Sequence, residues 1–516
     1  MNACATLAAF LAALVLAGCT VVPGATARLP LRGEEERDLR RADALGLTPT
    51  ASLSMLPLIE SDFAWTLAES GETTGARTDF APSGASSVGS TVAADLEWFG
   101  RFSEREAPHV EDVVDPLARD ETFFAPADDA RLRYVWVDGT VRFENENGRE
   151  FSRGSNLYAS NRAVLRVADL FVLAVTPVLS FVENRNDLSD DSDFGFELEE
   201  VAATARAGPV EVTVGRGPLW WGPGRHGSLL LTNNAEPLDH VRISTADRLL
   251  LPGFLAYLGL LRAEIFLARL EGARPIANPL LAGARLSTRL LPWIEFGASR
   301  TAMFGGKGRS VSAQTILDVI TARGENTPEG PGDQKASLDA RIILPFSWQP
   351  IEIYGEYGGE DEAGGFFSNV AYVAGLYLPR IGPLEWLELS FELADTSLSG
   401  ERNTWYVSDD YLAGYTHEGN IIGHHAGPDA FDLWLSLVVH LDPSLRMEVS
   451  YDFEEHRKLD PVTERLHQFR VTVTKTVREH LDLSVFVGYD RWRNFRQVFG
   501  DDETGAAVGC ALHWYF

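Results

Sequence analysis

The fold class is decided by the stretch Arg446-Met447-Glu448-Val449-Ser450-Tyr451-Asp452-Phe453-Glu454, in which every second residue is apolar. Successive side chains of a β-strand point to opposite faces, so this period of two predicts a strand with one apolar and one polar face. Such a strand fits either a soluble sandwich or a membrane barrel whose apolar face meets lipid.

The same period recurs from about residue 131 to the end of the chain, clearly in 469–474 and 481–489. A soluble sheet of this size would need several domains, and no linker is recognisable after residue 131. The last residues of the chain show the same alternation. The apolar side chains that fall on one face there are Val508, Cys510, Leu512, Trp514 and Phe516. These observations favour a membrane barrel over residues 131–516, with Cys510 toward lipid and Phe516 as a signal for the barrel assembly machinery.

The number of strands follows from the length of this region. It has 516 − 131 + 1 = 386 residues, and a strand with its share of turns takes roughly 20, which predicts near 16 to 20 strands. The longest apolar run, Leu249 to Leu261, is interrupted by Pro252 and Gly253. We therefore expect an all-β transmembrane fold, an antiparallel barrel, without a membrane helix.

The chain begins with an export signal, because the short apolar run Leu7 to Leu16 is followed by small residues. Two cleavage sites compete. Leu16-Ala17-Gly18-Cys19 resembles a lipobox, which would make residues 1–18 the signal peptide and Cys19 a lipidated N-terminus. Ala25-Thr26-Ala27 instead fits cleavage after residue 27. Either site means that the chain is exported.

Residues 28–130 are predicted to form a periplasmic helical region and a linker. Charged residues surround Leu39, Ala42 and Leu45 in 34–45, and Gly46 follows where a C-cap glycine is expected. Helical spacing also appears in 57–67 and 91–106, on either side of the Gly- and Ser-rich segment 71–90.

Composition excludes some functions. Lys and Arg number 45 against 74 Asp and Glu, a formal net charge of −29, which argues against nucleic acid as a partner. No catalytic signature such as G-x-S-x-G or H-E-x-x-H is present. We expect no enzyme and no cofactor.

The segment from Gly215 to Asn234 combines five glycines and two prolines with the pair Trp220-Trp221. It formally contains G-x-G-x-x-G, but no helical pattern follows to bind a pyrophosphate. The aromatic faces of Trp220 and Trp221, with Arg225 and Asn234, suit a ring-shaped polar ligand such as a sugar. The same residues equally suit a well-packed internal turn.

A second group of candidate ligand-binding residues lies in the long stretch between residues 397 and 428. Long loops in such barrels face the outside of the cell, and clustered aromatics there can stack on sugars. The alternatives are an interfacial aromatic girdle or loops that pack on each other. His417, His424 and His425 match no common zinc spacing, so we expect no metal. The candidates are Trp405, Tyr406, Tyr411, Tyr415 and His417.

The chain resembles the capsule-assembly Wzi family. The resemblance rests on the Trp-Trp-Gly-Pro-Gly run at 220–224, on Gly-Ser-Leu-Leu-Leu at 227–231, on the Asn pair at 233–234, and on 299–309, 354–361 and 423–430. It implies an outer-membrane barrel of eighteen strands with a small periplasmic helical part. It also implies a lectin that holds capsular polysaccharide at the cell surface. We further expect a monomer in contact with outer-membrane lipid. A channel for small solutes, or a membrane-embedded glycan hydrolase, remains the alternative.

Overall fold

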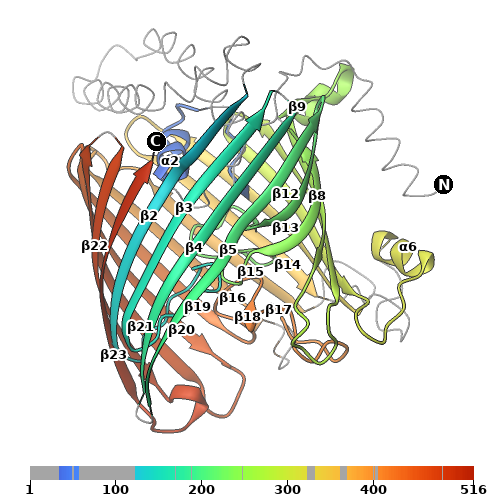
Figure 1. The fold of residues 1–516 in the computed structure, drawn as a ribbon. Coiled ribbons are helices and arrows are strands. Elements are labelled where there is room, and N and C mark those ends of the chain that lie inside the picture. The colour runs from blue at the N-terminus through green and yellow to red at the C-terminus, as the bar shows by residue number, and fades with distance from the viewer. Residues whose placement is uncertain are drawn as a thin grey trace.

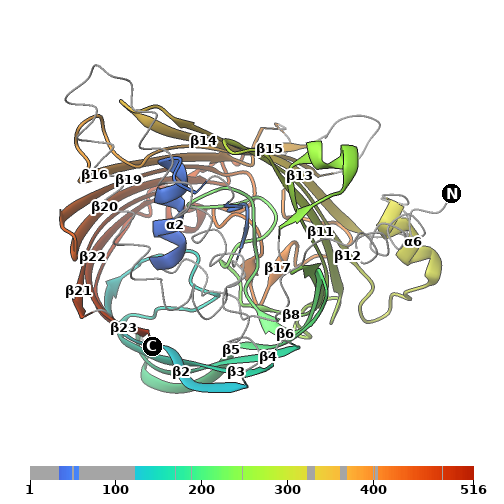
Figure 2. The ribbon, with the colours of Figure 1, turned by 90° about the horizontal axis from the view of Figure 1, so that it is seen from above.

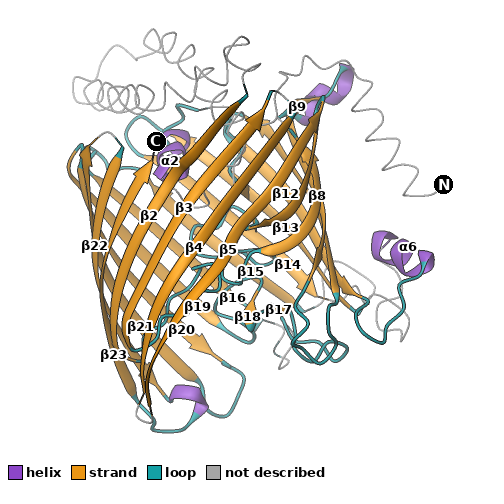
Figure 3. Ribbon diagram, in the orientation of Figure 1, coloured by secondary structure: helices purple, strands orange, loops and turns teal. Residues whose placement is uncertain are grey.

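The computed structural model describes residues 34–48, 51–56, 122–168, 170–186, 189–246, 248–321, 332–360, 369–398, 400, 405–478 and 480–515. Its main body is a closed antiparallel β-barrel (Figures 1 and 3). Eighteen strands form the wall: β2 (Phe123–Gly139), β3 (Gly154–Val167), β4 (Phe171–Asn186), β5 (Ser189–Ala207), β6 (Val210–Gly217), β8 (Leu238–Thr245), β10 (Leu260–Arg269), β11 (Leu280–Leu291), β12 (Ile294–Phe304), β13 (Asp333–Pro345), β14 (Pro350–Glu360), β15 (Val370–Leu378), β16 (Leu387–Asp395), β19 (Phe431–Asp442), β20 (Leu445–His456), β21 (Glu464–Arg478), β22 (Leu481–Arg493) and β23 (Glu503–Tyr515).

The barrel closes where β23 pairs with β2, from Asp129 opposite Tyr515 to Gly139 opposite Gly505. The other described elements are α2 (Glu34–Ala44), β1 (Met55–Leu56), β7 (Trp220–Trp221), β9 (Leu249–Leu250), η3 (Gly253–Leu258), α6 (Ala313–Thr321), β17 (Thr416–His417), β18 (Asn420–Ile421) and η4 (Phe495–Gln497). The two-residue β9 pairs only with the start of β10. The predicted antiparallel barrel and its strand number are confirmed.

The first strand begins at Phe123 rather than near residue 131. Its early part escaped the sequence pattern because Pro126 lies in it and the pairing with β3 shifts register between Ala125 and Asp129. An irregularity of this kind interrupts the alternation of apolar and polar residues. The barrel region therefore includes residues that the sequence assigned to the linker.

The wall is apolar outside and charged inside. In β20, Val449 is exposed on the outer face, whereas Asp452 and Glu454 are buried in the lumen. Cys510 is likewise exposed on the outer face of β23, as its parity predicted. A soluble sheet would bury its apolar face, so this arrangement is that of a barrel whose outer face meets lipid.

The two ends of the barrel differ. The connections at the end that carries α2 are mostly short (Figure 1). Large exposed aromatic side chains lie in several of these connections. Aromatic rings of this kind favour the interface between lipid and water. Among the described residues, no helix is long and apolar enough to cross a membrane. The exposed rim aromatics are Phe254, Tyr257, Trp293, Phe346, Trp348 and Trp386.

Helix α2 confirms the first predicted helix, and Gly46 ends it with a φ of 75°. Seen from above, α2 lies inside the ring of strands (Figure 2). Asp43 at its C-terminal end accepts hydrogen bonds from Arg289 of β11 at 2.8 Å and is ion-paired with Arg341 of β13 at 2.5 Å. These buried pairs fix the helix to the inner wall.

Several predictions fall outside the described residues. These are the signal peptide with its two cleavage sites, lipidation at Cys19, the helices over 57–67 and 91–106, the linker 71–90 and the terminal Phe516.

Candidate functional site

The connection between β6 and β8, residues 218–237, folds into the lumen; we call it the inner loop. The carboxylate of Glu392 in β16 accepts hydrogen bonds from three consecutive backbone N–H groups of this loop, those of Arg225 (2.6 Å), His226 (3.0 Å) and Gly227 (2.7 Å). A loop without regular partners must satisfy its backbone donors in another way. Here a charged side chain of the wall does so.

Other carboxylates of the wall fix the rest of the inner loop. Glu356 in β14 accepts hydrogen bonds from the hydroxyl of Ser228 at 2.7 Å and the backbone of Leu229 at 2.9 Å. Glu264 in β10 accepts one from the indole of Trp221 at 3.0 Å. Glycines and prolines allow the irregular path of the loop, and the inward acids of the wall bind its donors. The inner loop is a fixed plug.

The candidate residues of this segment take part in packing. Trp220 and Trp221 are both fully buried and pair with β1 from the N-terminal region. The guanidinium of Arg225 stacks on the ring of Tyr377, 3.8 Å from its centroid. The side chain of Asn234 donates to the carbonyl of Ile421 at 3.0 Å. This placement favours the internal turn over a sugar-binding surface.

The second candidate group, in the connection 396–430, also turns inward. Trp405 donates to the carbonyl of Asn369 at 2.7 Å, and Tyr406 donates to that of Leu229 at 2.7 Å. Both belong to one apolar cluster with Trp221 of the inner loop. Of the interpretations weighed from the sequence, loops that pack on each other fit this burial best.

The remaining members of that group are buried as well. Tyr411 donates to the carbonyl of Gly305 at 2.9 Å, Tyr415 donates to Thr301 at 3.0 Å, and His417 lies 2.9 Å from Glu271. Burial raises the pKa of the Tyr406 hydroxyl, which stays neutral at physiological pH. The structure brings the two predicted groups together as a packed plug.

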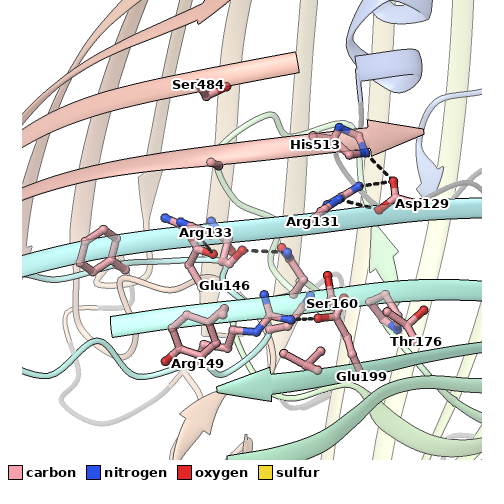
Figure 4. Close-up of a pocket in the computed structure, with 18 of the residues that line it drawn as sticks. Asp129, Arg131, Arg133, Glu146, Arg149, Ser160, Thr176, Glu199, Ser484 and His513 are labelled. Carbon is pink, nitrogen blue, oxygen red and sulfur yellow. Dashed lines mark hydrogen bonds and ion pairs between the residues drawn. The ribbon is translucent and has the colours of Figure 1, made fainter. Parts of the chain in front are cut away.

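Beside this plug the lumen contains a cavity of about 550 Å³. Its walls come from β2 to β5 and β21 to β23, and from the connection 140–153 that folds inward between β2 and β3 (Figure 4). The lining is dominated by charged and polar side chains, with a few rings among them. It includes Asp129, Arg131, Arg133, Phe143, Glu146, Arg149, Tyr158, Arg162, Glu199, Glu200, Arg470, Phe486 and His513.

Arginines and carboxylates alternate across this cavity. Arg133 of β2 donates to Glu146 at 2.6 Å, and Arg162 of β3 donates to Glu200 at 3.1 Å. At the end near α2, Arg131 and His513 both bind Asp129 (Figure 4). Burial alone would raise the pKa of Glu146, but Arg133 outweighs burial and holds that pKa below its ordinary value.

The sequence analysis singled out none of these cavity residues. A signal was present, because Arg131 and Arg133 alternate with Leu132 and Tyr134 and so fall on the inward face of a barrel strand. A sequence pattern does not show which inward-facing residues remain uncovered once the loops fill the lumen. Ligand contact by the packed aromatics stays a prediction.

Fold and site together define a transmembrane β-barrel of the outer-membrane type, whose lumen holds its own loops and the charged cavity described above. More particularly, the chain belongs to the capsule assembly protein Wzi family, whose model matches residues 130–507. A curated relative from Klebsiella pneumoniae, an uncharacterized 55.8 kDa protein in the cps region, is 28% identical over 168 residues. That match covers 32% of this chain and 33% of the relative, so it spans about a third of the relative's length.

Among solved structures, the fold is similar to Wzi of Escherichia coli, with a TM-score of 0.68 and 17% identity over 96% of this chain and 99% of that one. That protein is described as an outer membrane protein involved in group 1 capsule assembly and as a carbohydrate binding β-barrel. OccK7 of Pseudomonas aeruginosa has a TM-score of 0.44 and 12% identity over 75% of this chain and 97% of that one.

Proposed function

We propose that the protein binds capsular or other surface polysaccharide and attaches it to the cell surface, as an outer-membrane lectin. Membership of the capsule assembly family supports the general role. The observation that carries the binding function is the lumen cavity of about 550 Å³, with its arginines, carboxylates and rings.

The chemistry of the cavity suits a carbohydrate. Sugars present hydroxyl groups to polar side chains and C–H faces to aromatic rings, and both kinds of partner line this space. The guanidinium of Arg133 lies 5.7 Å from the centroid of Phe486, which combines a donor and a ring of the cavity lining at one place. Arg131, Arg149 and Arg162 add guanidinium donors for sugar hydroxyls. The cavity lining has five arginines and five acids, so its charges balance locally although the chain as a whole is strongly negative.

We propose a binding protein rather than an enzyme. A glycosidase needs one carboxylic acid and one free carboxylate on either side of a bond. In the cavity Glu146, Glu199 and Glu200 are each paired with an arginine. Carboxylates held in this way can accept hydrogen bonds from sugar hydroxyls, which is the role of a binding site. Weak contacts repeated along a polymer would provide avidity.

The same proposal includes the remaining partners. The outer face of the barrel contacts outer-membrane lipid, the chain works as a monomer, and Phe516 is the signal for the barrel assembly machinery. The N-terminal region, with α2 in the mouth of the barrel, faces the periplasm. Cys19 is the candidate lipid anchor.

The test is binding of the detergent-folded full chain to surface polysaccharide from its own source. The cavity variant Arg133→Ala plus Arg149→Ala is expected to bind at least about tenfold more weakly, because hydrogen bonds from charged groups contribute roughly 1.5 to 3 kcal/mol each. The matched control, Arg153→Ala plus Arg465→Ala, removes two exposed ion-paired arginines and should bind like wild type.

Three results would contradict the proposal. Wild type that fails to bind but conducts ions steadily in a planar bilayer supports the channel. Loss of polymer length on incubation supports the hydrolase. Equal binding by the cavity and control variants places any polysaccharide site elsewhere than this cavity.

A further inference from the structure

Four buried side chains from distant parts of the chain meet beside the plug. His226 comes from the inner loop, His425 from the connection 396–430, Asp432 from β19 and Asp452 from β20. One ligand atom from each lies within 4.8 Å of all the others. The closest approaches are 3.0 Å between His226 Nε2 and Asp452 Oδ2, and 3.0 Å between His425 Nε2 and Asp432 Oδ2.

We propose that this cluster binds one divalent transition-metal cation, Zn²⁺ being the preferred ion. Two imidazoles and two carboxylates form the mixed nitrogen and oxygen donor set that zinc accepts in a tetrahedral site. With metal–ligand bonds of about 2.0 to 2.2 Å, tetrahedral donor atoms stand about 3.4 Å apart. The separations run from 3.0 Å to at most 4.8 Å, so the shorter ones would lengthen and the longer ones would contract when the ion binds.

Charge supports a cation at this place. A bound cation would hold both buried aspartates in their ionised form, and one divalent ion would neutralise their two negative charges while the imidazoles supply lone pairs. Asp432 is 2% exposed, and its Oδ2 lies 3.0 Å from His425 Nε2 and 3.7 Å from His424 Nε2. The direct ion pair of Arg142 is with neighbouring Glu454 at 2.7 Å, and the arginine acts on the two aspartates only through longer-range electrostatics.

A cation bound at this site would link the plug to the wall of the barrel. His226 and His425 belong to the two segments that fill the lumen, and Asp432 and Asp452 belong to adjacent, directly paired strands. A cation that joins all four binds only the assembled plug. It therefore stabilises the closed lumen by mass action, to a degree set by its concentration relative to its Kd.

The first experiment uses wild-type full chain, purified in detergent without chelator. We expect stoichiometric metal by elemental mass spectrometry, removal by a strong chelator with a lower Tm, and restoration of both by Zn²⁺. Substitution with Co²⁺ should produce the visible absorption of a tetrahedral nitrogen and oxygen site. A wild-type protein that takes up neither ion, with no shift in Tm, overturns the proposal whatever any variant does.

The second experiment compares Asp432→Asn with Asp395→Asn. Asp395 is also a buried aspartate at the end of a wall strand, but it pairs with Lys458 at 3.2 Å. We expect Asp432→Asn to weaken metal binding by at least about tenfold, the loss typical of even an outer-shell partner, and Asp395→Asn to leave it unchanged. Equal metal content in both variants contradicts the assignment. Neither readout involves polysaccharide, so this inference and the lectin proposal can fail separately.

Discussion

The carboxylate of Glu392 lies 2.7 Å from the backbone nitrogen of Gly227, inside the barrel. Glu392 belongs to the wall and Gly227 to the inner loop, which are 165 residues apart in the chain. The same carboxylate also accepts the N–H groups of Arg225 and His226. One side chain thus satisfies three backbone donors that have no sheet or helix to pair with.

Glu392→Gln is expected to loosen the plug. The amide retains one acceptor oxygen but loses the charge and directs its own N–H₂ toward backbone donors, so we expect a loss of about 2 to 3 kcal/mol in the stability of this region. Hydrogen exchange by mass spectrometry should show faster exchange at 222–229. The control is Asp138→Asn, which also replaces a carboxylate by an amide but at an exposed ion pair. Unchanged exchange in Glu392→Gln would show that the inner loop keeps its conformation without the Glu392 carboxylate.

Gly227→Ala tests the close approach of the two inward segments. A Cβ added to Gly227 would lie 2.2 Å from ring atoms of His424, so the ring or the loop must move. Overpacking of this kind costs about 1 to 3 kcal/mol. Gly217→Ala, where an added Cβ meets nothing within 4 Å, is the matched control. The measurement is Tm of the folded barrel in detergent, and equal values for both variants would contradict the packing described.

Trp405→Ala separates packing from ligand contact. Because Trp405 is fully buried and packs with Tyr406 and Leu229, we expect a loss of about 3 to 5 kcal/mol, with polysaccharide affinity per folded molecule unchanged. Leu412→Ala, on the same connection but 77% exposed, is the control and should change neither the stability nor the affinity. If Trp405→Ala folds with normal Tm and loses binding, the sequence interpretation as a sugar platform is restored.

Low pH should weaken the contact between Glu271 and His417. Burial opposes the charge of Glu271, but the hydrogen bond with His417 and the nearby Arg274 hold the pKa of Glu271 below its ordinary value. A lowered native pKa contributes stability above the ordinary glutamate pKa of about 4.3, and this contribution is lost as pH falls through the lowered value. The Tm difference between wild type and Glu271→Gln should therefore be present at pH 7 and shrink toward pH 3. A constant difference across that range would argue against this linkage.

Asp43→Asn should free α2 from the barrel mouth. The change leaves Arg289 and Arg341 without their shared carboxylate, and breaking a buried ion pair typically costs about 3 to 5 kcal/mol. Limited proteolysis should then cut near residues 34–48 faster than in wild type. Asp38→Asn removes a longer pair with Arg37 at 3.5 Å and should be cut like wild type. Equal protection of both variants would mean that other contacts hold the helix.

Much of the wall was predictable because its signal is local. Alternation in 446–454 predicts both the strand and its orientation, and the structure places Val449 outside and Glu454 inside accordingly. The helix over 34–45 was predictable from its spacing and from Gly46. The start of β2 was not, because Pro126 and a register shift interrupt the alternation.

The sequence by itself determined the class of fold, since the period of side chains along a strand and the motif at 220–234 are properties of neighbouring residues. Only the tertiary structure decided what those residues do. Trp221 and Trp405 are buried in one apolar cluster although 405 − 221 = 184 residues separate them, because wall carboxylates bind the loops inside the barrel. The open cavity and the cluster of His226 with Asp432 exist only once eighteen strands close, since long-range contacts leave no periodic trace in the chain.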